Sequence, residues 1–315
     1  MFLRESRCMK IVVVGSSNTD LVVRVPHIPA PGETVLGADM QTIPGGKGAN
    51  QAVAAARLGG NVTFIARVGE DAYGAAAIAH YREEGLDVSH VHHTPGVPSG
   101  VALIAVQAGS GENAIVVAPG ANAHLSVADL DAAADAIRTA QAVVLSLEVP
   151  MESVQRAAEI ASDAGVPVVL NPAPAQELPA ELLSKISVLT PNQTEARQLL
   201  GVSENEVVTP EDLAKRLLSL GIGAAVLTVG KDGCLVATSE GVEAVPGYAV
   251  SAIDTVAAGD CFTGALAVEM AQGKPLRDAA RFANAAAAVK VTRHGAQPGL
   301  PTRADVEAFQ SSASE

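Results

Sequence analysis

The chain has 315 residues, of which 21 are basic and 34 are acidic, so its formal net charge is −13. Hydrophobic residues make up 48% and charged residues 17% of the sequence, which excludes a disordered protein, because disorder requires high net charge and little apolar surface. The acidic balance, with no run of Lys or Arg, argues against a nucleic-acid partner. An anionic substrate would therefore have to be held by backbone N–H groups, a metal ion or a few placed cations.

The cysteines and the N-terminal segment indicate the cellular compartment of the protein. Cys8, Cys234 and Cys261 are far apart in the sequence and fit neither a disulfide framework nor a zinc site. Residues 1–9 contain charges where a signal peptide needs an apolar run, and no apolar stretch is long enough to span a bilayer. We expect a cytoplasmic protein with reduced thiols and no membrane partner, in which residues 1–9 form an N-terminal tail.

Short β-branched segments alternate with longer alanine-rich segments along most of the chain. The predicted strands cover residues 11–14, 62–66, 101–106, 114–117, 143–147, 167–170, 188–190, 225–228 and 234–237. The predicted helices cover residues 50–58, 72–84, 126–139, 151–164, 193–200, 210–220, 260–272 and 276–291. This alternation is typical of βαβ units, so the expected fold class is α/β, a three-layer fold with a mostly parallel central sheet and helices on both faces.

Two regions interrupt this alternation. Residues 21–25 and 34–42 are separated by a proline-rich segment without a helix, and residues 100–107 and 113–118 flank a glycine-containing turn. We interpret these segments as antiparallel strands added to the main sheet, where they form a small β-sheet lid near the active face.

These patterns predict one domain over residues 10–310, with the lid embedded at about 19–45 and 98–118, followed by a C-terminal tail over residues 311–315.

A cluster of histidines, His90, His92 and His93, has no Cys or carboxylate set to complete a zinc site. A solvated loop is the favoured interpretation of this cluster.

The first candidate site is the segment GGKGAN, residues 45–50, just before a predicted helix. Its glycines allow the backbone to approach a ligand closely, and the helix N-terminus offers unpaired N–H donors. Lys47 and Asn50 add a cation and an amide suited to hydroxyl groups. The alternative is a plain glycine-rich turn with an Asn N-cap.

The second candidate site is the segment DTVAAGD, residues 254–260, which leads directly into a predicted helix. Free N–H groups and the helix dipole predict an anion pocket above Gly259. Asp260 would lie beside this pocket and accept a proton from a hydroxyl that attacks a phosphoryl group; the alternative is helix N-capping. We expect the helix dipole to lower the pKa of Asp260 and make it a weak base, which is tolerable when the proton is transferred late in the reaction.

Seven segments together resemble the ribokinase/phosphofructokinase-B (PfkB) family of ATP-dependent carbohydrate kinases, over about residues 11–309. They are GSSNTD (15–20), PGET (31–34), GGKGANQAVAAARLG (45–59), NPAPA (171–175), TPNQTE (190–195), DTVAAGD (254–260) and GAQP (295–298). GGKGAN and AAGD are specific to the family, and NPAPA with SSNTD narrows the resemblance toward its ribose-phosphorylating members. The resemblance implies a ribokinase-like fold and phosphorylation of D-ribose at the 5-hydroxyl to give ribose 5-phosphate.

The resemblance also implies roles for individual residues. Asp260 is the base that activates the sugar hydroxyl, and the backbone of Ala257, Ala258 and Gly259 forms the anion hole. The residues implied to hold the sugar, besides Asp260, are Asn18, Asp20, Gly46, Lys47, Asn50 and Glu148. Asn192 and Glu195 are implied to organise Mg²⁺ and the ATP phosphates. The nucleotide site as a whole is implied to contain Asn192, Glu195, Thr228, Gly230, Gly233, Gly259 and Asn284.

A monovalent cation, typically K⁺, is also implied by the resemblance. Its ligands would be Asp254 and the carbonyls of Val256, Lys290, Arg293 and Gly295. The family usually has a serine as the last ligand, where this chain has Gly299, so a weaker K⁺ dependence is expected.

The expected partners are ATP and D-ribose, and family members form homodimers through the lid sheet. Two alternatives remain beside the D-ribose interpretation. The first is a kinase of the same family for another sugar or a nucleoside. The second is a non-catalytic sugar-binding or regulatory homologue. Asp260, the AAG segment and the N-x-x-E element all count against the second, because a binding protein has no use for the base.

Overall fold

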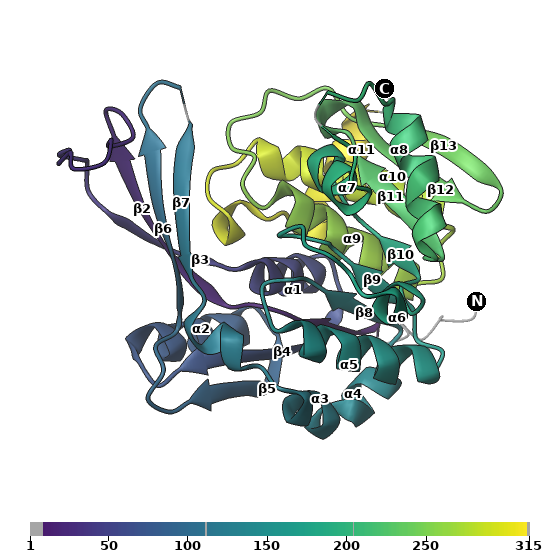
Figure 1. The fold of residues 1–315 in the computed structure, drawn as a ribbon, viewed down its shortest axis with the longest axis horizontal. Coiled ribbons are helices and arrows are strands. Elements are labelled where there is room, and N and C mark those ends of the chain that lie inside the picture. Colours follow the sequence, from purple (N-terminus) through teal and green to yellow (C-terminus); the bar gives the residue numbers. More distant parts are fainter. Residues whose placement is uncertain (1–8, 111, 204, 314–315) are drawn as a thin grey trace.

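The computed structural model describes residues 9–313 except residues 111 and 204. Its centre is a nine-stranded sheet with the order β13-β12-β11-β10-β9-β8-β1-β4-β5 (Figure 1). From β5 to β11 the neighbouring strands are parallel, and β12 and β13 continue the sheet antiparallel. These strands are β1 Lys10–Val14, β4 Asn61–Gly69, β5 Asp87–Thr94, β8 Ala142–Leu145, β9 Val168–Leu170, β10 Val188–Leu189, β11 Ala224–Thr228, β12 Gly233–Thr238 and β13 Gly241–Pro246.

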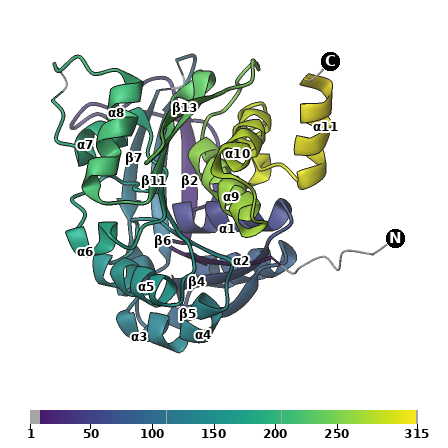
Figure 2. The same ribbon diagram turned by 90° about the vertical axis from the view of Figure 1, so that its right-hand side faces the viewer.

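Helices cover both faces of this sheet (Figure 2). Side chains of β1 alternate between the two cores: Ile11 and Val13 belong to one, Val12 and Val14 to the other, as expected for a strand buried on both faces. The first face holds α1 Lys47–Arg57, α2 Ala72–Glu83, α9 Ala258–Ala271, α10 Leu276–Val291 and α11 Arg303–Ala313. The second holds α3 Val127–Ala132, α4 Ala134–Arg138, α5 Met151–Asp163, α6 Ala180–Leu183, α7 Gln193–Leu199 and α8 Pro210–Leu217. The predicted three-layer α/β fold is confirmed.

A second, four-stranded sheet stands apart from the main one, at the left in Figure 1. Its order is β3-β2-β6-β7, with the strands β2 Asn18–Val25, β3 Gln41–Gly45, β6 Gly100–Gln107 and β7 Asn113–Ala118. The prediction that these strands extend the main sheet is wrong. Strand β2 pairs antiparallel with β3 on one edge and parallel with β6 on the other, so both its hydrogen-bonding edges are used within the small sheet.

Several predicted boundaries differ from the structure. The strand expected at residues 34–42 lies instead at Gln41–Gly45, so it overlaps the prediction only at residues 41 and 42. The helix expected at residues 126–139 is broken at Ala133 into α3 and α4. Helix α11 continues to Ala313, so residues 311–313 of the predicted C-terminal tail are helical. The predicted N-terminal tail, apart from Met9, and residues 314 and 315 lie outside the described residues.

The histidine cluster lies in a strand, not in the predicted loop. His90, His92 and His93 belong to β5, which pairs in parallel with β4 at the edge of the main sheet. An edge strand has one side in solvent, so polar residues are tolerated there and conceal the strand in the sequence. Among the described residues, no three His, Cys, Asp or Glu side chains are placed to hold a metal ion. The same part of the chain contains no helix long and apolar enough to cross a membrane.

Candidate active site

A cleft of about 980 Å³ lies between the small sheet and the loop that precedes α9. Side chains of β2, β3, β6 and β7 line one wall, and residues 252–257 and 294–296 line the other. Eleven of the predicted site residues line this cleft: Asn18, Asp20, Gly46, Lys47, Asn50, Glu148, Asp254, Val256, Ala257, Asp260 and Gly295. The fold therefore brings the GGKGAN and DTVAAGD segments together, although about 200 residues separate them in the sequence.

The GGKGAN segment forms the start of α1 and lies against the end of β1. Gly46 is the N-cap with a φ of 90°, and a Cβ added to Gly48 would lie 2.6 Å from the backbone of Gly15. Only glycine permits this approach. Because α1 begins at Lys47, Asn50 is inside the helix, and its interpretation as an N-cap is wrong. The Asn50 side chain lines the cleft.

Glu148 holds the N-terminus of α1. One of its carboxylate oxygens, Oε2, accepts a hydrogen bond from the backbone N–H of Lys47 at 3.0 Å and from Ser16 Oγ at 2.5 Å. A carboxylate is favoured at this position because it meets the unpaired N–H groups and the positive end of the helix dipole. Glu148 thus joins the end of β8 to the start of α1.

Asp20 presents a carboxylate to the cleft without a hydrogen-bond donor among the described residues. The carboxylate lies against Gly45, where an added Cβ would lie 2.3 Å from Asp20 Oδ2. Burial, together with the nearby carboxylates of Glu148 and Asp260, raises the pKa of Asp20 to about 6. Such a group is suited to a ligand that supplies hydroxyl donors, since those donors would stabilise its ionised form.

Asp260 lies in the first turn of α9 and is 6% exposed. Asn50 Nδ2 donates to its Oδ2 at 3.0 Å, and Gln51 Nε2 donates to its Oδ1 at 3.1 Å. Burial raises the pKa of Asp260 despite the opposing effects of Lys47 and these two hydrogen bonds. The predicted lowering of this pKa by the helix dipole is therefore wrong. Burial removes water from the carboxylate, and that loss outweighs the stabilisation by nearby donors.

Lys47 is the cation among these carboxylates. Burial alone would lower the pKa of Lys47, but the charges of Asp260, Glu148 and Glu195 together raise it above its usual value. The Lys47 ammonium therefore stays charged and offsets the negative charge on this side of the cleft.

The start of α9 has the geometry of an anion site. Ala257 is the N-cap with a φ of 60°, the one positive value for a non-glycine residue in the described part of the chain. An L-residue with a side chain adopts this conformation at a cost, and such strain is concentrated at functional sites. A Cβ added to Gly259 would meet no atom within 4 Å, so the space above the first turn is open. The Ala258 N–H donates to the carbonyl of Thr255 at 3.2 Å, whereas the N–H of Gly259 has no helical partner and is left for a ligand in that space.

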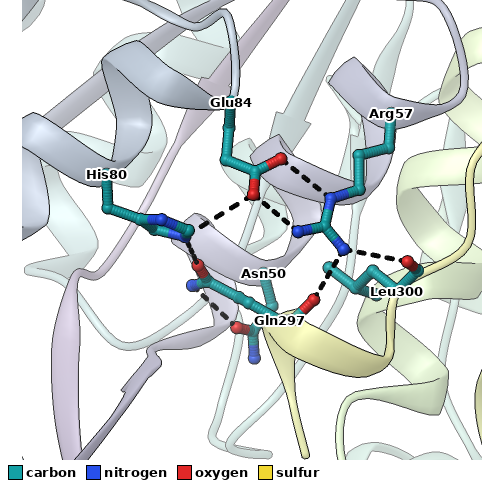
Figure 3. Close-up of polar contacts among 6 residues, drawn as sticks. All are labelled: Asn50, Arg57, His80, Glu84, Gln297 and Leu300. Carbon is teal, nitrogen blue, oxygen red and sulfur yellow. Dashed lines mark hydrogen bonds and ion pairs between the residues drawn. The ribbon is translucent and has the colours of Figure 1, made fainter. Parts of the chain in front are cut away.

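Two residues of the site were not identified from the sequence. Gln51 binds Asp260 directly, and Gln297 Nε2 donates to Asn50 Oδ1 at 3.1 Å (Figure 3). Gln51 lies within the long motif 45–59 and Gln297 within GAQP, so both stood in segments that carry the resemblance. Which residue of the first motif contacts Asp260, and which residue of the second contacts Asn50, depends on backbone geometry that the motifs alone do not specify.

Gln297 is itself fixed by residues farther from the cleft. Its Oε1 lies 2.8 Å from His80 Nε2, and its carbonyl accepts a hydrogen bond from Arg57 at 2.8 Å (Figure 3). Arg57 makes two contacts with the Glu84 carboxylate, at 2.8 and 2.5 Å. A chain of polar contacts therefore runs from Asp260 through Asn50 to α2, and it restricts the rotamer of Asn50.

The residues predicted for the nucleotide lie beyond the cleft. Asn192 and Glu195 form a capping box at the start of α7, with both reciprocal hydrogen bonds at 2.8 Å. Thr228 ends β11 beside Asn192, and Gly230 begins a short 3₁₀ turn. Gly233, with a φ of 102°, begins β12. The Asn284 amide donates to the carbonyls of Val245 and Pro246, at the end of β13.

The residues predicted for a monovalent cation come from the loop that precedes α9 and from the end of α10 and the turn that follows it. Asp254 accepts the backbone N–H groups of Val256 at 2.9 Å and Gly295 at 2.8 Å. The Nζ atom of Lys290 donates to the carbonyls of Asp254 at 3.0 Å and Arg293 at 3.3 Å. Gly299 lies next to this lysine.

The sequence pattern of the pfkB family of carbohydrate kinases matches residues 9–303. The chain belongs to this family. It is 42% identical over 299 residues to a ribokinase of Haemophilus influenzae, and the match spans 95% of this chain and 97% of that protein.

The fold of this chain is also similar to two solved structures. A ribokinase crystal structure from Thermotoga maritima has a TM-score of 0.88 at 37% identity, covering 96% of this chain and 99% of that one. The Arabidopsis thaliana ribokinase, solved as a complex with ribose and ATP, has a TM-score of 0.86 at 33% identity, covering 96% and 98%. The pfkB carbohydrate kinase fold is thus shown for nearly the whole chain.

The raised pKa of Asp20 predicts how stability depends on pH in this pfkB kinase. Its pKa is raised from 3.8 to about 6 in the folded state, so folding favours the protonated form. The contribution of Asp20 to stability is then full below pH 3.8 and decreases as pH rises through about 6. Asp20→Asn should increase the free energy of unfolding at pH 7.5 by at most about 3 kcal/mol, and by much less at about pH 4.5.

Urea unfolding of the wild type and Asp20→Asn at both pH values measures this difference. Asp39→Asn, on the exposed segment before β3, is the matched control and should change the free energy of unfolding by the same small amount at both pH values. An equal stabilisation by Asp20→Asn at both pH values would contradict the raised pKa of the Asp20 carboxyl.

Proposed function

We propose that this pfkB kinase transfers the γ-phosphoryl group of ATP to the 5-hydroxyl of D-ribose, giving ribose 5-phosphate and ADP. The ribokinase names of its relatives, and the ribose and ATP in the Arabidopsis structure, support this substrate pair. The observation that most favours it is the placement of the buried Asp260 carboxylate, beside the open N-terminus of α9 and facing the same cleft as Asp20.

The sugar would bind between β2 and α1. Asp20 and Glu148 accept hydrogen bonds from ribose hydroxyls, while Asn18, Lys47 and Asn50 donate to them, with the Gly46 backbone close to the ring. A buried carboxylate aimed at a hydroxyl discriminates strongly against sugars that lack it, because it would then stay desolvated and unpaired. This accounts for the unpaired Asp20 side chain.

Phosphoryl transfer would follow from this arrangement. The ribose 5-oxygen forms a bond to the γ-phosphorus, the bond from that phosphorus to the β,γ-bridging oxygen breaks, and ADP leaves with the electron pair. Asp260 accepts the hydroxyl proton, and its raised pKa makes it a stronger base than an exposed carboxylate. The N–H groups at Ala257 and Gly259 would stabilise the charge on the transferred group, and the N–H of Ala258 would join them on leaving the Thr255 carbonyl.

Mg²⁺ is expected with ATP, as in ATP-dependent kinases generally. Mg²⁺ is usually held by one or two carboxylates together with substrate phosphates, so a cluster of three protein ligands is not needed. Glu195 fits this role, because its half-buried carboxylate lies near Lys47, whose pKa it helps to raise, and near Asp260, whose charge helps to raise the pKa of Glu195. The ion neutralises phosphate charge when bound, while Asn192 fixes the position of Glu195 through the capping box.

The ATP site would lie along the ends of β11 and β12. Thr228, Gly230 and Gly233 form the turn between these strands, where the backbone can approach a nucleotide closely. Asn284 would contribute mainly by holding β13, since its amide is bonded to that strand. We do not include a bound K⁺ in this proposal, because the Lys290 ammonium already binds the carbonyls of Asp254 and Arg293, two of the residues expected to hold the ion.

The small sheet would act as a lid over the sugar and as the contact between two copies in a homodimer. Its outer face exposes apolar side chains: Leu103 and Val116 pair across β6 and β7 and are 52% and 65% exposed. Their neighbours on the strands, Ile104 and Ile115, point into the cleft.

We also propose a cytoplasmic location, where Cys234 and Cys261 remain reduced. Burial raises the pKa of each of these two thiols to about 12.

Replacing Asp260 tests the proposed base. Asp260→Asn removes the proton acceptor while keeping the shape of the side chain, so kcat should fall by several orders of magnitude. ATP binding, measured by calorimetry without sugar, should change little. A variant that keeps a tenth of the wild-type rate would exclude Asp260 as the base.

A substrate panel tests the sugar and separates the alternatives. With ATP, we expect kcat/KM to be highest for D-ribose and lower for 2-deoxyribose, fructose and adenosine, because the site is built around several hydroxyls. Asn18→Ala should raise the KM for ribose more than the KM for ATP. Preferred turnover of adenosine would favour a nucleoside kinase, and sugar binding without turnover would favour a non-catalytic homologue.

Replacing exposed apolar residues on the small sheet tests the dimer. Leu103→Asp with Val116→Asp would place charge on the outer face and should convert dimers to monomers in light scattering at micromolar protein concentration. Val207→Asp is the control, because Val207 is 98% exposed and distant in sequence from the sheet. Unchanged mass for the sheet variant would reject this surface as the dimer contact.

A further inference from the structure

Lys290 is a fully buried lysine, with an exposed fraction of 0%. Lysine is almost never buried completely unless its charge is compensated, because desolvating an ammonium group is costly. Within the described residues, Lys290 has no carboxylate within ion-pair distance; its Nζ donates to the carbonyls of Asp254 and Arg293. The group is therefore bound as a cation in a site made of backbone oxygens.

This position favours a positive charge for two reasons. Lys290 lies in the last turn of α10, where the helix dipole is negative and carbonyls lack intrahelical partners. The Asp254 carboxylate is also close: burial lowers the pKa of Lys290, but Asp254 opposes that shift. The carbonyls belong to two segments, the loop before α9 and the turn after α10, which the ammonium group holds together.

Gly299 leaves room for the lysine side chain. A Cβ at residue 299 would lie 3.2 Å from Lys290 Cε and 3.1 Å from the carbonyl oxygen of His294, both closer than ordinary contacts. Any side chain at this position would therefore displace the lysine stem or the turn. The missing side chain at 299 and the long side chain at 290 are complementary.

We propose that the ammonium group of Lys290 is the permanent cation of this carbonyl site, so that the enzyme works without a free monovalent cation. A K⁺ ion and the Nζ atom cannot both bind the carbonyls of Asp254 and Arg293, since each would occupy the point where these oxygens converge. The cation expected from the sequence resemblance is thus replaced by a side chain of the protein itself.

Lys290 acts as a positioning residue for the anion site. Its ammonium fixes the carbonyl of Asp254, while the Asp254 carboxylate fixes the N–H groups of Val256 and Gly295. These bonds hold the loop that ends at Ala257, whose strained backbone starts α9. The N–H groups that would meet the phosphoryl group are thereby oriented before substrate binds.

The first experiment compares K⁺, Na⁺ and tetramethylammonium salts at equal ionic strength on the wild-type enzyme. We expect the same kcat and the same Tm in all three, because no ion binds at the site. A saturable activation by K⁺, or a Tm increase specific to K⁺, would overturn the proposal. The kinetic measurement rests on the proposed function, but the Tm does not, so an inactive protein would reject that function and still leave this inference tested.

The second experiment removes the ammonium group. Lys290→Ala should reduce kcat by about 10- to 100-fold with less effect on the KM for ribose, and it should lower the Tm. K⁺ should restore both, since the ion can enter the space that the side chain leaves. The double variant Lys290→Ala with Gly299→Ser adds a hydroxyl oxygen and should need less K⁺ for the same recovery.

Two further variants complete the test. Lys290→Met keeps most of the side-chain volume without the charge, so it should be impaired and should not respond to K⁺. Lys274→Ala, an exposed lysine after α9, is the matched control and should behave as the wild type in every salt. Should Lys290→Ala fail to fold in Na⁺, refolding in K⁺ supports the proposal. Wild-type kcat and Tm in Lys290→Ala, or an equal response of the Ala and Met variants to K⁺, would overturn it.

Discussion

Burial of the Asp260 carboxylate at the start of α9 is the constraint on which the rest of the site depends. An ionised group out of water needs donors, and Asn50 and Gln51 of α1 provide them. Both donors require α1 to begin at Lys47, which in turn requires the close approach of Gly48 to Gly15 and the Glu148 carboxylate at the helix start. The glycine-rich segment is therefore needed for packing as much as for ligand contact.

The net charge of −13 has a local counterpart in the cleft. The charges of Glu148 and Asp260 contribute to the raised pKa of Asp20, and the same two carboxylates help to keep Lys47 charged. In the proposed function, an acidic protein can still attract a phosphoryl group here, because the attraction would come from backbone N–H groups at a helix N-terminus. Those groups contribute no formal charge, which is why composition alone cannot reveal an anion site.

The sequence was sufficient for features that are local or repeated. Strand and helix alternation predicted the three layers, and the two glycine-containing motifs located α1 and α9. The sequence was insufficient for contacts and pKa shifts that depend on segments far apart in the chain. Gln297 reaches Asn50 across 247 positions, and the sign of the Asp260 pKa shift follows from burial by the whole fold and not from the helix that carries the residue. Strands of the small sheet were found, but their separation from the main sheet depends on which edges β2 uses.

Lys290 and Gly299 show how a single position can be misread when its partner is ignored. Taken alone, Gly299 indicates a cation site that lacks one ligand and binds K⁺ weakly. Beside Lys290, the same glycine is the space that admits an ammonium group to the carbonyls. A tethered cation needs no free ion, so the site is filled at every salt concentration, whereas a dissolved ion must be bound from solution. The cost is that the buried charge depends on Asp254, whose loss would expose Lys290 to the full penalty of desolvation.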